Sequence, residues 1–359
     1  KLIVYFSLHI LIMSGLAQLV AIGPQDVHLT ENPNVTFFES VHKRHTNFAT
    51  FMKKQVITGN PQPGGLSTVR IERYGDLLNY VFLVATKNDE SQLIGDWSDV
   101  IESAELVIGG SVVDTQDVVF SEEIAIDTLA TNGSKSFPAS LHSGNGTQSF
   151  FYPFRFFFCE AWATALPLVA MQYHEVEIRI RWSENLDPSY IMEFGARFTS
   201  LDEEERRSFA ERKELDMVIF QVQKSVPSGN KKQQLSFNHP VKFIASSNFN
   251  NDNALVSRTN KLMIQIDGNE VAEYLFSVPY YTSIPAYYHT AQSSSNSENI
   301  FIMPFCLECS RYQPTGTLNF SRITTFEIHC NQPITKPIYA VNYNILRLKN
   351  GMAGVLYSN

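Results

Sequence analysis

The chain has 359 residues, more than a single domain usually holds, and 44% of them are hydrophobic, which is enough for a sizeable core. Its formal net charge of -8 argues against broad, sequence-independent binding to nucleic acid, because such binding needs a basic surface. The four cysteines are too few for a disulfide scaffold in a chain of this length, and the 26 phenylalanines and 15 tyrosines favour strands.

Residues 1–12 are apolar behind a single lysine. A membrane-spanning helix needs about 20 such residues, so this run is too short to cross a bilayer. It has the length of a signal-peptide core, with small residues near Ala17 that could form a cleavage site. We interpret residues 1–12 as an extension upstream of Met13 rather than a working signal, whereas a mature end at Gln18 would favour secretion.

The next stretch predicts strands. Val27 and Leu29 alternate with polar residues, Asn32-Pro33 forms a turn, and the strand pattern resumes over residues 35–38. The basic cluster at 42–45 contains two histidines, which could form a metal or anion site. We favour a solvated strand end, because no carboxylate or third histidine follows closely.

Further strands are predicted in the first half of the chain, each bounded by turn residues. They cover residues 67–71, 77–84, 101–108 and 111–114. Gly109-Gly110 reads as a hairpin turn, and no lysine or helix start follows that would make it a phosphate-binding loop. Residues 115–149 are polar and rich in turn-formers, so we expect a flexible loop there.

Residues 156–182 form the longest apolar stretch, and its end switches to a period of two. Val176, Ile178 and Ile180 alternate with charged residues, which predicts a strand with one face on the core. His174 beside Glu175 could be an acid–base pair. We favour a histidine at a strand start, because neighbours in a strand point to opposite faces.

One convincing helix is predicted, over residues 200–215. Ser200 is positioned to cap it, with Glu203 three residues on as in a capping box, and Glu203 and Arg207 are spaced for an ion pair. We favour a solvated connector between two domains over a charged docking face.

Strands are predicted again in the second half, over residues 217–222, 235–244, 262–267 and 300–305, and in the closing run 338–359. Cys306 and Cys309 form a lone C-x-x-C motif, with His329-Cys330 about twenty residues further on. A zinc site is one interpretation. We favour reduced, partly buried thiols, because no second C-x-x-C is present.

Four asparagines lie in N-glycosylation sequons: Asn34, Asn132, Asn145 and Asn319. Asn34 and Asn319 fall in strand-like motifs and are expected to be structural. Asn132 and Asn145 fall in the polar region, and they are the candidate N-glycan sites.

Two halves rich in short strands, joined by one helix, predict two β-sandwich domains. Several segments then resemble one family, the major capsid proteins of nucleocytoplasmic large DNA viruses of the iridovirus, phycodnavirus, mimivirus and marseillevirus types. The segments are GPQDVHLTENPNVTFFESVHKRHTNFA (23–49), IESAELVIGGSVVD (101–114), ALPLVAMQYHEVEIRIRW (165–182), FNHPVKFIA (237–245), QPTGTLNFSR (313–322) and IYAVNYNILRLKNGMAGVLYSN (338–359).

The resemblance implies an all-β fold of two tandem eight-stranded antiparallel jelly rolls, a double jelly roll, joined by a short helical linker. The implied division is an N-terminal extension and arm (1–26), a first jelly roll (27–199), the linker (200–215) and a second jelly roll (216–359). Family members carry a helical excursion in the region where this chain has its polar stretch, and they are longer.

The resemblance also implies a structural function without catalytic residues, cofactor or metal. Pseudo-hexagonal homotrimers would tile an icosahedral shell in the virion, assembled in the host cytoplasm. The implied partners are other copies of the chain and minor capsid and penton proteins, with an internal viral membrane nearby and no direct contact with nucleic acid.

Three alternatives stay open. The chain could be a minor or divergent capsid paralogue. It could be a carbohydrate-binding jelly-roll protein, although Trp97, Trp162 and Trp182 are few and scattered. It could also be a metal-dependent cupin-like enzyme, but none of the nine histidines forms an H-x-H group.

Overall fold

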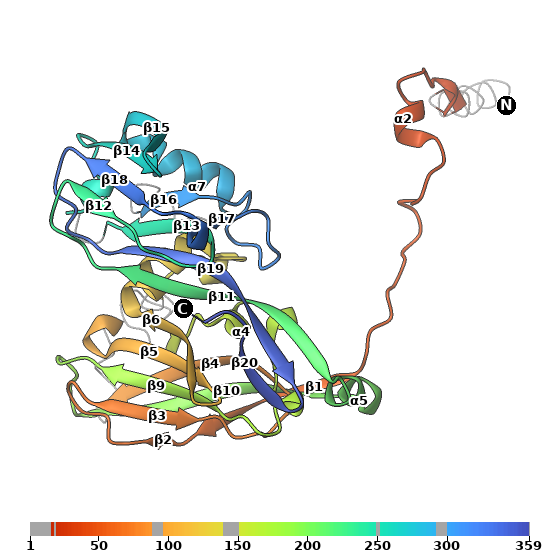
Figure 1. Ribbon diagram of the computed structural model, residues 1–359. Helices are drawn as coiled ribbons and strands as arrows, with labels where there is room; N and C mark the ends of the chain where they lie inside the picture. Colours follow the sequence, from red (N-terminus) through yellow and green to blue (C-terminus); the bar gives the residue numbers. More distant parts are fainter. Residues whose placement is uncertain are drawn as a thin grey trace, which may run out of the picture. The chain divides into compact units, whose positions relative to one another are not determined.

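The computed structural model describes residues 16–17, 19–87, 96–138, 151–248, 252–291 and 300–358. Contacts divide the chain into two units, Lys1–Thr46 and Asn47–Asn359, and each is described by itself. Figure 1 gives the element labels used below.

The described part of the first unit contains a short helix rather than the strands predicted over residues 27–38. Helix α2 spans Val27–Thr30, and the backbone N–H of Thr30 donates to the carbonyl of Asp26 at 2.9 Å. The strand prediction was wrong because alternation stabilises a strand only beside a partner, and this stretch has no partner strand among the described residues. The basic cluster at 42–45 is exposed and precedes the first strand of the second unit.

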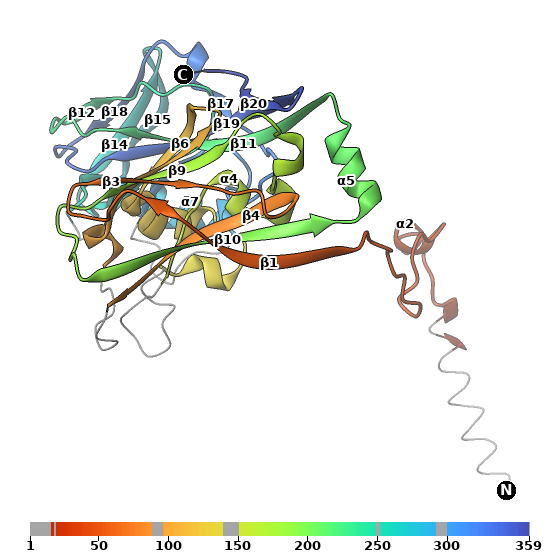
Figure 2. The ribbon, with the colours of Figure 1, turned by 90° about the horizontal axis from the view of Figure 1, so that it is seen from below.

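The first half of the second unit forms two antiparallel sheets. One has the order β1 (Phe48–Gln55), β10 (Tyr190–Leu201), β4 (Leu77–Lys87) and β7 (Phe151–Pro153), with β8 (Leu166–Pro167) also paired to β4. The other has the order β2 (Ile57–Thr58), β3 (Leu66–Arg70), β9 (Val176–Trp182), β5 (Ile101–Ile108) and β6 (Ser111–Asp117). Figure 2 shows these sheets as separate layers.

The second half also forms two antiparallel sheets. One has the order β11 (Glu214–Ser225), β19 (Ile338–Lys349), β13 (Pro240–Ser247) and β16 (Ile300–Pro304); β17 (Leu318–Asn319) pairs with β13, and β20 (Met352–Val355) pairs with β19. The other has the order β12 (Lys232–Gln234), β18 (Phe326–Cys330), β14 (Lys261–Ile266) and β15 (Asn269–Phe276).

The two halves share one strand order. The order β1-β10-β4-β7 in the first half corresponds to β11-β19-β13-β16 in the second, and the order β3-β9-β5-β6 corresponds to β12-β18-β14-β15. This is the connectivity of a jelly roll, in which two sheets wound from Greek keys face each other. The fold is therefore a double jelly roll, as the resemblance implied.

The predicted helix is confirmed as α5, Glu203–Ala210, between β10 and β11 (Figure 1). Its N-cap is Asp202, whose side chain accepts from the N–H of Glu204, and not Ser200, which lies in β10. Glu203 and Arg207 form the expected ion pair at 2.8 Å.

The remaining helices are short. They are η1 (Trp97–Asp99), η2 (Phe120–Ile124, a π-helical turn), α3 (Ala125–Thr128), η3 (Gly133–Ser136), α4 (Phe157–Glu160), η5 (Trp162–Thr164), η6 (Leu168–Ala170), η8 (Ala254–Val256), α6 (Ser277–Tyr280), α7 (Ser283–His289) and η9 (Phe320–Arg322). None of the helices in the described ranges is long and apolar enough to cross a membrane.

The prediction of a flexible loop over residues 115–149 is wrong for residues 120–128, which form η2 and α3. Phe120 and Ile124 of η2 and Leu129 just after α3 are buried. They pack in a core cluster with residues of β13, β16 and β19, which holds this segment in place. The turn-formers that suggested a loop lie mostly further along, and residues 139–150 are outside the described ranges.

The predicted strand after residue 175 is confirmed, because β9 buries Val176, Ile178, Ile180 and Trp182 and leaves Arg181 exposed. These side chains belong to the core cluster of the first half. A second cluster fills the second half, and a third joins residues of both halves. The contact between the two jelly rolls is thus part of the core.

Candidate functional surfaces

The two jelly rolls meet where two sheet edges face each other, and we call this contact the seam. β6 and β11 each lie at the end of their sheet, so within the described ranges each has one backbone edge without a ladder partner. Val222 on β11 donates its N–H to Asp114 Oδ1 on β6 at 2.8 Å, and the amide of Gln221 donates to the carbonyl of Val113. Side chains therefore satisfy edge groups that would otherwise invite another strand.

Asp117 anchors the end of β6 with both carboxylate oxygens. Oδ1 accepts from the N–H of Phe120 at 2.9 Å, which starts the π-helical turn. Oδ2 accepts from Lys224 Nζ at 2.6 Å and from the hydroxyl of Tyr339 at 2.7 Å, both in the second jelly roll. One side chain thus positions η2 and links β6 to β11 and β19.

Apolar side chains fill the seam beside these hydrogen bonds. The third core cluster combines buried residues of η2, α3 and the segment after α3 with buried residues of β13, β16, β19 and the turn after β16. Its members are Phe120, Ile124, Ala125, Leu129, Phe243, Ala245, Ile300, Ile302, Cys306, Cys309, Tyr339 and Val341. Burial of apolar area contributes about 25 cal/mol per Å², so this shared cluster stabilises the contact between the two rolls.

The C-terminal hairpin closes the seam at its other end. Leu346 and Leu348 of β19 and Ala353 of β20 belong to the core cluster of the first jelly roll. The N–H of Tyr173 donates to the carbonyl of Gly351 at 2.9 Å, and Gly351 adopts φ +78°, which a side chain would strain.

His174 belongs to the same contact, since its Nδ1 lies 2.7 Å from the carbonyl oxygen of Ala353. Glu175 instead pairs with Arg70 on β3. The acid–base alternative for His174 and Glu175 is therefore wrong, and the histidine is a backbone anchor.

Two carboxyl groups at the seam hold protons more tightly than usual. Burial raises the pKa of Asp114 to about 7, although hydrogen bonds from Val222, Gln116 and Thr115 oppose the shift. Burial likewise raises the pKa of Glu123 to about 7, opposed by a hydrogen bond from the hydroxyl of Ser247. Sequence patterns could not reveal these groups, because their partners are more than one hundred residues away along the chain.

The cysteine motif lies at the seam and not in a cluster with His329-Cys330. Cys306 and Cys309 are in the third core cluster, whereas Cys330 is in β18 and packs in the second. No group of three histidine, cysteine, aspartate or glutamate side chains within the described ranges could hold a metal ion.

Of the two candidate glycan sites, the structure describes Asn132 alone. Asn132 is exposed and caps η3, where its side-chain oxygen accepts from the N–H of Lys135 at 3.0 Å. Asn145 lies outside the described residues. Asn319 caps η9 in the same way, by accepting from the N–H of Ser321 at 3.1 Å.

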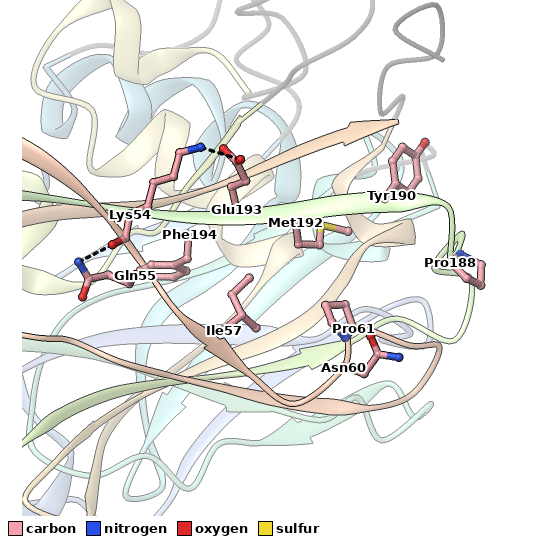
Figure 3. Close-up of a pocket in the computed structure, with 10 residues that line it drawn as sticks. All are labelled: Lys54, Gln55, Ile57, Asn60, Pro61, Pro188, Tyr190, Met192, Glu193 and Phe194. Atoms are coloured by element: carbon pink, nitrogen blue, oxygen red, sulfur yellow. Dashed lines mark hydrogen bonds and ion pairs between the residues drawn. The ribbon is translucent and has the colours of Figure 1, made fainter. Parts of the chain in front are cut away.

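A cleft of about 350 Å³ lies at the edge of the first jelly roll, between β1, β2 and β10 (Figure 3). Its one lining carboxylate, Glu193, forms an ion pair with Lys54 at 2.6 Å. Glycoside cleavage needs two carboxyl groups flanking the substrate, and this cleft lacks that arrangement. It is better described as the gap where the edges of two sheets diverge.

Comparisons with known proteins agree with this architecture. Residues 36–200 match the family model described as the major capsid protein N-terminus. The major capsid protein of Pyramimonas orientalis virus is 30% identical over 96% of this chain and 99% of its own length. The major capsid protein of Paramecium bursaria Chlorella virus 1 is 28% identical with the same coverage.

Solved structures show the same fold. A quasi-atomic model of the PBCV-1 virus capsid has a TM-score of 0.76, at 22% identity, and covers 90% of this chain and 100% of its own. The Faustovirus major capsid protein has a TM-score of 0.62 at 13% identity, covering 91% of this chain and 94% of its own.

These findings define a double jelly-roll structural protein. The chain belongs to the major capsid protein family of large DNA viruses, whose members form the capsid shell of the virus particle and are not enzymes.

The raised pKa of Glu123 predicts a dependence of stability on pH. The folded state keeps the proton up to about pH 7, whereas an unfolded carboxyl releases it near its ordinary pKa of about 4, so the wild-type chain loses stability as pH rises between these values. The side chain of the Glu123→Gln variant cannot ionise. The free energy of unfolding of this variant minus that of the wild type, measured by urea unfolding, should therefore increase from pH 5 to pH 8.

Glu102→Gln is the matched control, because Glu102 is exposed on β5. Its stability relative to wild type should stay constant across the same pH range. If the Glu123→Gln difference were equally flat, Glu123 would not be protonated in the folded chain.

Proposed function

We propose that three copies of this chain associate into a pseudo-hexagonal capsomer, and that such capsomers tile an icosahedral shell. The observation that carries the proposal is the shared strand order of the two jelly rolls. Three copies of two similar rolls present six similar sides, which is what lateral packing in a closed shell requires. The seam supports it further, because buried side chains and hydrogen bonds join the two rolls within one chain.

The proposed division of the chain is an arm, a first jelly roll, a helical linker and a second jelly roll. It is supported by the sheets, since β1 to β10 form one pair of sheets and β11 to β20 the other, with α5 between them. The unit that ends at Thr46 supports an arm longer than the 1–26 expected from the sequence.

The arm would contact neighbouring subunits or minor capsid and penton proteins. Its large apolar side chains are exposed within its own unit, among them Leu19 (72%), Val20 (79%), Phe37 (93%) and Phe38 (99%). Burying one such side chain contributes about 1.5–3 kcal/mol, so docking on another protein would be favourable. Assembly would take place in the host cytoplasm, beside an internal viral membrane and without direct contact to nucleic acid.

The full chain should elute as a single species with three times the mass of one chain, measured by size-exclusion chromatography with light scattering. Removing residues 1–46, the whole arm, should leave this trimer intact, because β1 begins at Phe48 and no strand of either jelly roll is deleted. The same deletion should impair shells seen by electron microscopy in cells that supply the other virion proteins.

Removing residues 1–12 alone is the matched control, and it should assemble as the full chain does. A monomer at all concentrations would contradict the capsomer, whereas normal shells from the chain lacking residues 1–46 would contradict only the proposed function of the arm.

We also propose that Asn132 and Asn145 accept N-glycans if the chain meets a glycosylating compartment. The support at Asn132 is its exposure and its position in Asn132-Gly133-Ser134. Mass spectrometry of virion peptides should show modified Asn132 and unmodified Asn319. Unmodified peptides at both candidate positions would rule the proposal out for the virus studied.

A further inference from the structure

The turn after β16 brings two thiols together at the seam. The Sγ atoms of Cys306 and Cys309 are 3.6 Å apart, which is van der Waals contact between sulfur atoms. Both side chains are buried, with 3% and 0% of their surfaces exposed. They pack in the cluster that joins the two jelly rolls.

The backbone of this turn is held from two sides, which keeps the thiols adjacent. The N–H of Cys309 donates to the carbonyl of His289 at 2.7 Å, and the imidazole of His289 lies 2.9 Å from the carbonyl of Cys306. On the other side, Thr315 accepts from the N–H of Leu307 at 3.2 Å through its carbonyl and from the N–H of Glu308 at 3.2 Å through its hydroxyl.

Electrostatics make the two sulfurs unequal. The hydrogen bond from Cys309 and the positive charge of Lys242 lower the pKa of the Cys306 thiol. Lys242 is 3% exposed, and its Nζ donates to the carbonyl of Arg311 at 2.6 Å, which holds the amino group beside the turn. Burial lowers the pKa of Lys242, and the nearby cysteines and glutamates oppose this shift. The hydrogen bond to Cys306, together with burial, raises the pKa of Cys309 well above its usual value.

The other two cysteines lack this arrangement. Burial raises the pKa of Cys159 to about 12 and that of Cys330 to about 12, and neither is within the C-x-x-C turn. A thiolate is the form that attacks an oxidant, so Cys306 is the reactive member among the four.

We propose that Cys306 and Cys309 are a peroxide-oxidisable dithiol that closes to a reversible disulfide at the seam between the two jelly rolls. A peroxide is the co-reactant because the thiols are buried and only a small oxidant can reach them. Leu307, which lies between them in the sequence, is 75% exposed, so the turn that carries the two thiols reaches the protein surface.

The reaction proceeds in two steps. The Cys306 thiolate attacks one peroxide oxygen, the O–O bond breaks, and the products are a sulfenic acid on Cys306 and hydroxide, which takes a proton to become water. Cys309 then attacks the Cys306 sulfur, the S–O bond breaks, and the departing hydroxide takes the Cys309 proton. Two thiols are oxidised by two electrons, and one peroxide is reduced to two waters.

The disulfide would fix the turn that contacts α7 through His289 and β13 through Lys242. Disulfides do not persist in a reducing compartment. The disulfide would therefore form, and stabilise the seam, after a particle leaves such a compartment. The inference is independent of the trimer, since it concerns one chain.

The test uses the reduced full chain treated with hydrogen peroxide, then unfolded and alkylated with N-ethylmaleimide. Intact mass and peptide mapping should show that two of the four cysteines lose alkylation, that these are Cys306 and Cys309, and that dithiothreitol restores both. The thermal unfolding midpoint of the oxidised chain should rise and should return on reduction.

Variants separate the steps. A Cys159→Ser, Cys330→Ser double variant should lose alkylation at the same two positions. Cys309→Ser should form no disulfide and should leave a sulfenic acid on Cys306 that dimedone labels. Should Cys309→Ser fail to fold, the peptide map of the wild-type chain still decides the question.

Two outcomes would overturn the proposal. One is full alkylation of Cys306 and Cys309 at peroxide concentrations that oxidise an unstructured peptide containing the same C-x-x-C motif. The other is a disulfide that includes Cys159 or Cys330, or one that links two chains.

Discussion

Two sheet edges, β6 and β11, are buried against each other without a ladder of backbone hydrogen bonds between them. The hydrogen bond from the Val222 N–H to the Asp114 carboxylate is one of the contacts that make this burial possible. Each buried N–H or C=O group left without a hydrogen bond costs about 1–3 kcal/mol, and an unpaired sheet edge is a template for another strand. Side chains of β6 and β11 resolve this conflict, and the surrounding apolar cluster can then form. The two β-sandwiches of the chain are thereby joined through a shared buried core.

This constraint explains features that are otherwise unrelated. The first residue of the π-helical turn η2, Phe120, donates its N–H to Asp117, which also binds Lys224 and Tyr339 of the second roll. The hairpin of β19 and β20 extends into the core of the first roll and anchors on His174. Because these contacts lie within one chain, contacts between subunits of a capsid protein need not also order the subunit.

Local patterns in the sequence predicted the elements that depend on local physics. The alternation around Ile178 predicted β9, and the capping-box and ion-pair spacing of Glu203 predicted α5. The prediction failed at Val27, where alternation had no partner strand, and at Phe120, where polar turn-formers further along masked a buried helical segment. The seam was beyond local reasoning, because Asp114 and its partner Val222 are 108 residues apart.

Hydrogen–deuterium exchange at single amides tests the central claim most directly, because protection reports the free energy of the opening that exposes each N–H. If the seam is part of the core, the Val222 amide should exchange as slowly as amides in the middle of β9, and Asp114→Ala should accelerate exchange in β6 and β11 together. Fast exchange at Val222 in the wild-type chain, with β9 still protected, would show that the two jelly rolls open independently and would contradict the account.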